Sequence, residues 1–172
     1  MSDLSMQLGR TSSPETFFET LRAEREMYET YLDYFSLLDN KLSCERAGEC
    51  FTEDTEVTYR MKGPPLVFHG RADYVSWLKD ATEAQEMTAH VTGQHRFEWA
   101  NGKPRLIAYV TSWQWFTHTA HLGENRPADF VTIGYSEDDF EHVGGRWLIA
   151  RRAVRPVAGL VAAGSLPGAK AD

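Results

Sequence analysis

The stretch TAHVTGQHRFEWANGKPRLIAYVTSWQWFTHT, residues 88–119, decides the fold class. At its centre is Asn101-Gly102, a pair that tolerates positive φ and is typical of a two-residue β-hairpin turn. No helix of useful length interrupts the segments on either side. The stretch therefore predicts two long antiparallel strands, over about 88–99 and 105–119.

The chain after this hairpin continues in the same way. Segments 128–142 and 146–155 are separated by Gly144-Gly145, which predicts a second hairpin. Residues 122–127 are expected to form a longer loop. The second half of the chain is therefore expected to be an antiparallel sheet.

The chain before the sheet begins with helical periodicity. Ser13 is a suitable N-cap, Pro14 suits the first helical position, and apolar residues at helical spacing predict one long helix over 13–39. Asp39 continues the buried face of this helix, where a carboxylate needs a partner or a role.

Shorter elements are expected between the long helix and the sheet. Ser43 predicts the cap of a short helix that runs to Phe51, before a turn at 52–54. Alternation around Val57 and Tyr59 predicts a strand, residues 66–69 a brief second one, and residues 71–84 a helix.

Helices first and strands second predict an α+β fold. We expect a strongly curved, mixed or antiparallel sheet that wraps around the N-terminal helices and encloses a pocket. One domain is expected over residues 13–157, with a flexible N-terminal tail over 1–12 and an Ala/Gly-rich C-terminal tail over 158–172.

Composition and charge exclude several classes of partner. The 172 residues carry a net charge of −7, which repels phosphate backbones, so we expect no nucleic-acid partner. Apolar runs are shorter than the ~20 residues that span a bilayer, so no membrane partner is expected. The opening MSDLSMQLGR contains no cationic segment followed by an apolar one, and we expect a cytoplasmic protein. Cys44 and Cys50 are expected to be reduced thiols.

Several stretches together carry a resemblance to a known family. They are YFSLLD (34–39), CFTEDTEVTY (50–59), FHGR (68–71), TAH (88–90) and GGRWLIARR (144–152). The pattern, over roughly residues 15–157, resembles the SnoaL-like branch of the nuclear transport factor 2-like superfamily of cone-shaped α+β barrels. Its polar residues look most similar to those of scytalone dehydratase and its relatives. The resemblance implies a homodimer or homotrimer, because sheets of this superfamily commonly pair face to face.

The resemblance also implies a site. Asp39 and His90 take the positions of an acid–base dyad, and Tyr59 that of a tyrosine that holds a water or substrate oxygen. A neutral histidine accepts a proton while the aspartate fixes its tautomer and stabilises the imidazolium, so we expect no metal and no other cofactor. Two positions depart from the fungal dehydratase: Leu38 replaces a second tyrosine, and an aromatic near Trp115 replaces a second histidine.

Aromatic residues are expected to bind the substrate. They are Tyr34, Trp113, Trp115 and Phe116, although alternation along a strand prevents the last three from all facing one side.

Each candidate also has a structural interpretation. Asp39 could satisfy backbone groups at the helix end, and Tyr59 could be a half-buried strand tyrosine. His90 shares the more polar face of its strand with Thr88 and Thr92, which would face solvent or, in a barrel, the pocket.

Two charged clusters are expected at the surface. The acidic run Glu137-Asp138-Asp139 is typical of a solvated strand edge. Arg151, Arg152 and Arg155 alternate with apolar residues and are expected on the exposed face, or in a subunit contact, of the last strand. His118 and His121 lack a third ligand nearby for a zinc site.

Two functions remain open at this level. The first is a cofactor-independent dehydratase, or an isomerase or cyclase, that acts on a hydrophobic polyketide- or terpenoid-like small molecule. The alternative is a non-catalytic ligand-binding or assembly subunit, similar to the small subunit of ring-hydroxylating dioxygenases. An enzyme needs Asp39 within hydrogen-bond reach of His90, whereas an assembly subunit does not.

Overall fold

The computed structural model describes residues 14–40, 43–60 and 63–161. The expected N-terminal tail, the Ser13 cap and residues 162–172 of the expected C-terminal tail lie outside the described residues. The elements in chain order are α2 (Pro14–Asp39), α3 (Cys44–Gly48), β1 (Phe51–Tyr59), β2 (Leu66–His69), α4 (Arg71–Thr82), β3 (Gln85–Ala100), β4 (Lys103–Phe116), η1 (Thr117–Leu122), β5 (Phe130–Val143) and β6 (Arg146–Val161).

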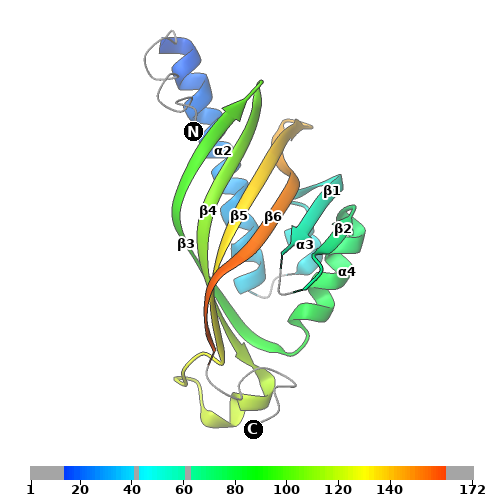
Figure 1. The fold of residues 1–172 in the computed structure, drawn as a ribbon, viewed down its shortest axis with the longest axis vertical. Helices are drawn as coiled ribbons and strands as arrows, with labels where there is room; N and C mark the ends of the chain where they lie inside the picture. The colour runs from blue at the N-terminus through cyan, green and yellow to red at the C-terminus, as the bar shows by residue number, and fades with distance from the viewer. Residues whose placement is uncertain (1–13, 41–42, 61–62, 162–172) are drawn as a thin grey trace.

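The strands form one curved sheet in the order β2-β1-β6-β5-β4-β3. All neighbours pair antiparallel except β1 and β6, which are parallel, so the sheet is mixed. In Figure 1, α2 crosses behind the long strands, while α3 and α4 lie beside β1 and β2. The expected α+β class is confirmed, with a sheet that is not closed into a full barrel.

Both hairpin turns form as expected. Asn101 and Gly102 have φ values of 54° and 75°, and Gly144 and Gly145 have values of 58° and 83°. This left-handed conformation at both turn positions matches the twist of the flanking strands. The two turns set the register near the tips of the two long hairpins.

Several element boundaries differ from expectation, among them those of β1, β4 and β6. The short helix ends at Gly48 and β1 begins at Phe51, because the Ile149 N–H donates to the Cys50 carbonyl at 2.9 Å and Phe51 pairs with Ile149. β4 ends at Phe116 and the 3₁₀ helix η1 follows it. β6 continues to Val161, paired with β5, instead of ending near 155.

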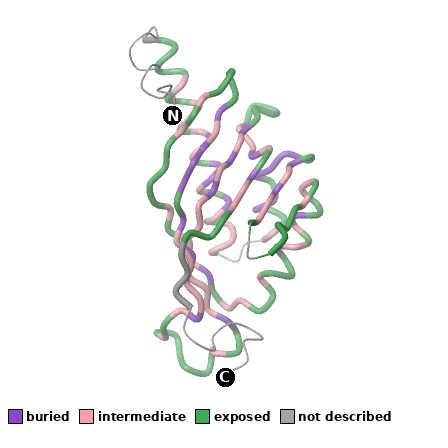
Figure 2. The backbone as a smooth tube through the Cα atoms, in the orientation of Figure 1, coloured by how far each residue is buried: buried purple, intermediate pink, exposed green. Residues whose placement is uncertain are grey.

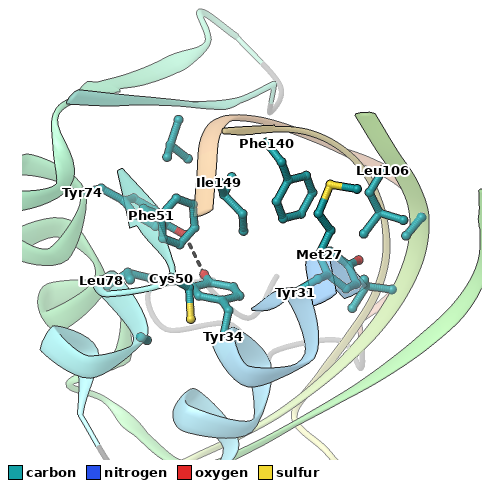
Figure 3. Close-up of a cluster of buried hydrophobic side chains, with 14 residues drawn as sticks. Met27, Tyr31, Tyr34, Cys50, Phe51, Tyr74, Leu78, Leu106, Phe140 and Ile149 are labelled. Carbon is teal, nitrogen blue, oxygen red and sulfur yellow. Dashed lines mark hydrogen bonds between the residues drawn. The ribbon is translucent and has the colours of Figure 1, made fainter. Parts of the chain in front are cut away.

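The core lies between α2 and the sheet. Figure 2 shows burial concentrated in the middle of the strands, with exposed hairpin tips. Met27, Tyr31 and Tyr34 of α2 are almost fully buried and point from one helix face toward Phe140 and Ile149 of the sheet (Figure 3). The helical spacing of the apolar residues therefore marks the face that packs on the sheet.

The expectation that both charged clusters lie at the surface is wrong for one residue in each. Asp138 is 0% exposed and Arg152 1% exposed. The Arg152 Nε–H donates to Asp138 Oδ1 at 2.6 Å, and Nη2 lies 3.3 Å from Oδ2. The two residues are cross-strand partners on β5 and β6, and their side chains share the inner face of the sheet. Such a pair is tolerated inside a protein only when each charge has a partner.

Aromatic rings of α2 and β1 close over this ion pair. The Arg152 guanidinium carbon lies 4.4 Å from the centre of the Tyr34 ring and 5.1 Å from that of Phe51. Burial raises the pKa of the Asp138 carboxyl, and the attraction of Arg152 opposes that rise. The pair is thus excluded from water by the helix that packs on it.

Removing one partner of this pair leaves an unpaired buried charge. We expect Arg152→Met to lower the free energy of unfolding by about 3–5 kcal/mol, and the double variant Arg152→Met/Asp138→Leu to recover most of the loss. Urea unfolding followed by circular dichroism measures both.

The matched control is the neighbouring Arg151→Met. Arg151 forms an exposed ion pair with Glu56 at 3.3 Å, so its removal should cost less than about 1 kcal/mol. Equal losses for Arg151→Met and Arg152→Met would contradict a special role for the buried pair.

Candidate active site

The structure brings Asp39 and His90 into direct contact. Asp39 is the last residue of α2, and His90 lies on β3. The carboxylate binds His90 twice: Oδ1 lies 2.6 Å from ring Nδ1, and Oδ2 accepts the backbone N–H at 2.8 Å. The side chains are 23% and 14% exposed, so the pair is mostly shielded but still reachable by a solute.

Packing of α2 on β3 places the carboxylate there. The Tyr28 ring stacks on His95 with centroids 4.1 Å apart, and its hydroxyl lies 3.2 Å from Thr92 Oγ1. Phe35 packs on the His90 ring at 4.7 Å. An aspartate at the negative end of a helix dipole does not stabilise the helix, so the bonds to His90 are what hold Asp39 in place.

The contact selects one tautomer of His90. An ionised carboxylate only accepts hydrogen bonds, so Nδ1 carries the proton and Nε2 is the unprotonated ring nitrogen. Ser112 Oγ lies 3.2 Å from Nε2 and is the donor in that arrangement. Nε2 is therefore the ring atom that can act as a base on the inner face of the sheet.

A β-bulge decides that His90 faces inward. Near the Asn101-Gly102 turn, His95 pairs with Ala108, and continuing that register would pair His90 with residue 113. The register shifts between Thr92 and His95, so His90 pairs with Ser112 instead. Ser112 was not expected from the sequence, and the isolated Gly93 within the strand was the signal that could have found it.

Tyr59 and Tyr34 meet around a third tyrosine. The Tyr34 and Tyr74 hydroxyls lie 2.6 Å apart, and those of Tyr59 and Tyr74 3.0 Å apart. Burial holds the pKa values of Tyr34 and Tyr74 well above 10. Tyr59 thus bonds to Tyr74, and neither Tyr59 nor Tyr34 is hydrogen-bonded to the dyad.

The three aromatic residues at the end of β4 divide between the two faces. Trp113 and Trp115 pair across from Ala89 and Met87, and alternation puts them on the face opposite His90. Phe116 is 6% exposed and lies four residues after Ser112, so alternation puts both side chains on the same face of β4. The two indoles therefore do not lie with the dyad, whereas Phe116 does lie on the inner side of the strand.

A pocket of about 210 Å³ is lined by residues that are close to the dyad in the chain, but neither Asp39 nor His90 is among its lining residues. Leu38, which precedes Asp39, and Thr88, two residues before His90 on the same face of β3, are among its lining residues. Within the described part of the chain, no group of three His, Cys, Asp or Glu side chains could hold a metal ion. No helix among those residues is long and apolar enough to cross a membrane.

Comparison with known proteins identifies the family and the fold. The sequence profile of the SnoaL-like domain family matches residues 19–153, well over half of the chain. No curated protein sequence matches the chain.

Solved structures share the fold at low sequence identity. A protein from Novosphingobium aromaticivorans provisionally assigned as a scytalone dehydratase is 22% identical, with a TM-score of 0.68 over 86% of this chain and 91% of its own. ActVI-ORFA from Streptomyces coelicolor is 18% identical, with a TM-score of 0.64 over 78% and 96%. The type 3 hexachlorocyclohexane dehydrochlorinase LinA from Novosphingobium barchaimii is 16% identical, with a TM-score of 0.66 over 88% and 96%.

The tautomer of His90 can be tested directly. At a pH where the ring is neutral, we expect ¹⁵N NMR to show the proton on Nδ1, because Asp39 accepts it. The exposed His69 ring in the same spectra serves as the comparison. Asp39→Ala should remove the preference, and a wild-type His90 protonated on Nε2 would contradict the assignment.

Proposed function

The chain belongs to the SnoaL-like domain family, and we propose that it is a cofactor-independent acid–base enzyme that eliminates water from a hydrophobic small molecule. The observation that carries the proposal is the 2.6 Å contact between Asp39 and His90, which leaves Nε2 unprotonated and bonded by the Ser112 hydroxyl. A mostly shielded imidazole held by a carboxylate is suited to proton abstraction.

The proposed reaction needs only one base that returns its proton. His90 Nε2 takes a proton from a carbon next to a carbonyl group, and Asp39 stabilises the imidazolium that forms. The electron pair of the broken C–H bond forms the new double bond as the β C–O bond breaks. The imidazolium then gives its proton to the departing hydroxide, so water leaves and the dyad is restored.

The same apparatus could move a double bond or close a ring, so the isomerase and cyclase alternatives differ only in the substrate. Elimination is favoured because the names of two fold neighbours describe it, one as a dehydratase and one as a dehydrochlorinase. The Phe35 ring beside His90 supports an apolar, polyketide- or terpenoid-like substrate. Tyr59 remains a proposed partner for a substrate oxygen, since its hydroxyl is oriented by Tyr74.

A bicyclic β-hydroxyketone tests the reaction. Dehydration of 3-hydroxy-1-tetralone gives 1-naphthol, whose fluorescence reports turnover. We expect His90→Gln and Asp39→Asn each to lower kcat/KM by about 10²- to 10⁴-fold, because both remove the proton acceptor or its support.

His69→Gln is the control, because His69 lies on β2, its side chain is 75% exposed, and the described interactions link it to neither Asp39 nor His90. It should keep wild-type kcat/KM. Full activity in a His90→Gln variant that circular dichroism shows to be folded would contradict the catalytic role of Asp39 and His90.

We also propose that a homodimer or homotrimer forms through the outer face of the sheet. Val91 and Tyr109 are 56% and 39% exposed there, and the Tyr135 ring packs against Tyr109 at 5.2 Å. Contiguous exposed apolar side chains of this kind mark interaction surfaces. Sedimentation equilibrium should show an oligomer that Val91→Glu dissociates, whereas a monomeric wild type at micromolar concentration would disprove it.

A further inference from the structure

Ser112 extends the contact between Asp39 and His90 to a line of three side chains. Asp39 Oδ1 lies 2.6 Å from His90 Nδ1, and His90 Nε2 lies 3.2 Å from Ser112 Oγ. The carboxylate holds the imidazole by one ring nitrogen, and the other nitrogen faces the hydroxyl. A carboxylate, an imidazole and a hydroxyl joined in this order form the arrangement that activates a serine for attack on a carbonyl carbon.

The Ser112 hydroxyl is oriented as a nucleophile requires. Because Nδ1 of His90 carries the proton that Asp39 accepts, Nε2 is an acceptor, and the O–H of Ser112 points at it. The proton of the hydroxyl therefore faces the base that would remove it.

The sheet beside Ser112 is open on its inner face. Thr132 pairs with Ser112 across β4 and β5, and Gln114 pairs with Phe130 one row further from the hairpin tips. α2 ends at Asp39, and Figure 1 shows the long strands continuing past that end. Gln114, Phe130 and Thr132 point to the inner face by alternation, yet all three are partly exposed. Small solutes therefore reach the inner face next to Ser112.

Gln114 supplies a hydrogen-bond donor at this open surface. Its Oε1 accepts from Gln85 Nε2 at 3.3 Å, whereas its own Nε2 donates to no group among the described residues. Gln114 follows Ser112 by two residues on the same face of β4, about 6–7 Å along the strand. A side-chain amide at that separation can bond the oxyanion that forms when the hydroxyl attacks a carbonyl group.

We propose that Ser112 is the nucleophile of a second activity at this site, the hydrolysis of esters of short carboxylic acids. His90 is the base, Asp39 orients it, and Gln114 bonds the carbonyl oxygen. Ser112 is 7% exposed, so the acyl group that reaches it is small. This activity goes beyond the proposed elimination, because the same dyad activates a hydroxyl of the protein and not a carbon of the substrate.

The ester is cleaved in two balanced steps. His90 Nε2 takes the Ser112 proton as Oγ attacks the carbonyl carbon, and one C=O electron pair moves to the oxygen. When that pair returns, the C–O bond to the alcohol breaks, and the imidazolium gives its proton to the leaving alkoxide. Water then attacks the acyl-serine in the same way, and the Ser112 oxygen leaves with the proton that His90 took from water. One ester and one water become one acid and one alcohol.

Methanesulfonyl fluoride tests the nucleophile without any turnover, because this small reagent forms a stable sulfonate with an activated serine and releases fluoride. We expect peptide mass spectrometry to find the methanesulfonyl group on Ser112, and Ser112→Ala to remove it. His90→Gln and Asp39→Asn should each slow the modification by about 10²- to 10⁴-fold, since an unassisted hydroxyl is a weak nucleophile.

Ser136 is the matched control, because it is a second serine on the inner face of the sheet with similar burial. Ser136 is 4% exposed, and its hydroxyl lies 3.2 Å from that of Tyr31, with no histidine partner among the described residues. The peptide that contains Ser136 should stay unmodified, and Ser136→Ala should leave the labelling of Ser112 unchanged.

4-Nitrophenyl acetate tests the complete cycle. We expect a burst of about one equivalent of 4-nitrophenolate, followed by a slower phase in which acetyl-Ser112 is hydrolysed. Gln114→Glu keeps the acceptor for Gln85 and removes the donor, so it should lower the burst rate by about 10²- to 10³-fold. A wild-type burst rate in this variant would contradict the role of Gln114.

Three results would each overturn the nucleophile: no sulfonate on Ser112, modification of other serines alone, or labelling of Ser112 that folded His90→Gln and Asp39→Asn variants do not slow. Circular dichroism establishes that the variants are folded. The 3-hydroxy-1-tetralone assay separates the two proposed activities. Labelling of Ser112 without dehydration of the tetralone would disprove the elimination alone, whereas dehydration without labelling would disprove the ester hydrolysis alone.

Discussion

The buried ion pair between Arg152 and Asp138 is the constraint on which the rest of the structure depends. Two opposite charges inside the protein are stable only if each is paired and water is kept out. β5 and β6 supply the charges as cross-strand partners, and Tyr34 and Phe51 close over the guanidinium. The position of α2 on the sheet is therefore fixed at this point, because moving the helix would expose the pair.

The candidate site is a consequence of that fixed helix. From Tyr34 to Asp39, α2 has a little more than one turn left, and it ends where β3 presents His90. The carboxylate at the end of the helix has one partner on the sheet, and both of its oxygens bind that residue. A rigid helix, anchored at the buried pair and ended at the dyad, holds the imidazole in one tautomer.

Much of the fold was predictable because it depends on local chemistry. The two glycine-containing turns, the long helix and the order of helices before strands follow from residues that are adjacent in the chain. The pairing of Asp39 with His90 was expected from a family resemblance, and the structure places the two side chains in contact. By contrast, Arg152 and Asp138 were expected at the surface, since a charge in an alternating strand pattern normally marks the solvent face. Only the pairing of β5 with β6 shows that the two charges neutralise each other.

By itself, the sequence determined the long helix and the four long strands, where the hairpins turn, and that a carboxylate ends the long helix. Those properties depend on the backbone preferences of a few neighbouring residues. The tertiary structure alone decided which face each strand residue occupies. A single extra residue in the bulge between Thr92 and His95 reverses the alternation along β3, so His90 pairs with Ser112 on the face toward α2, and not with Trp113 on the opposite face. The register of a strand depends on the partner it pairs with, and that partner lies outside any local window of sequence.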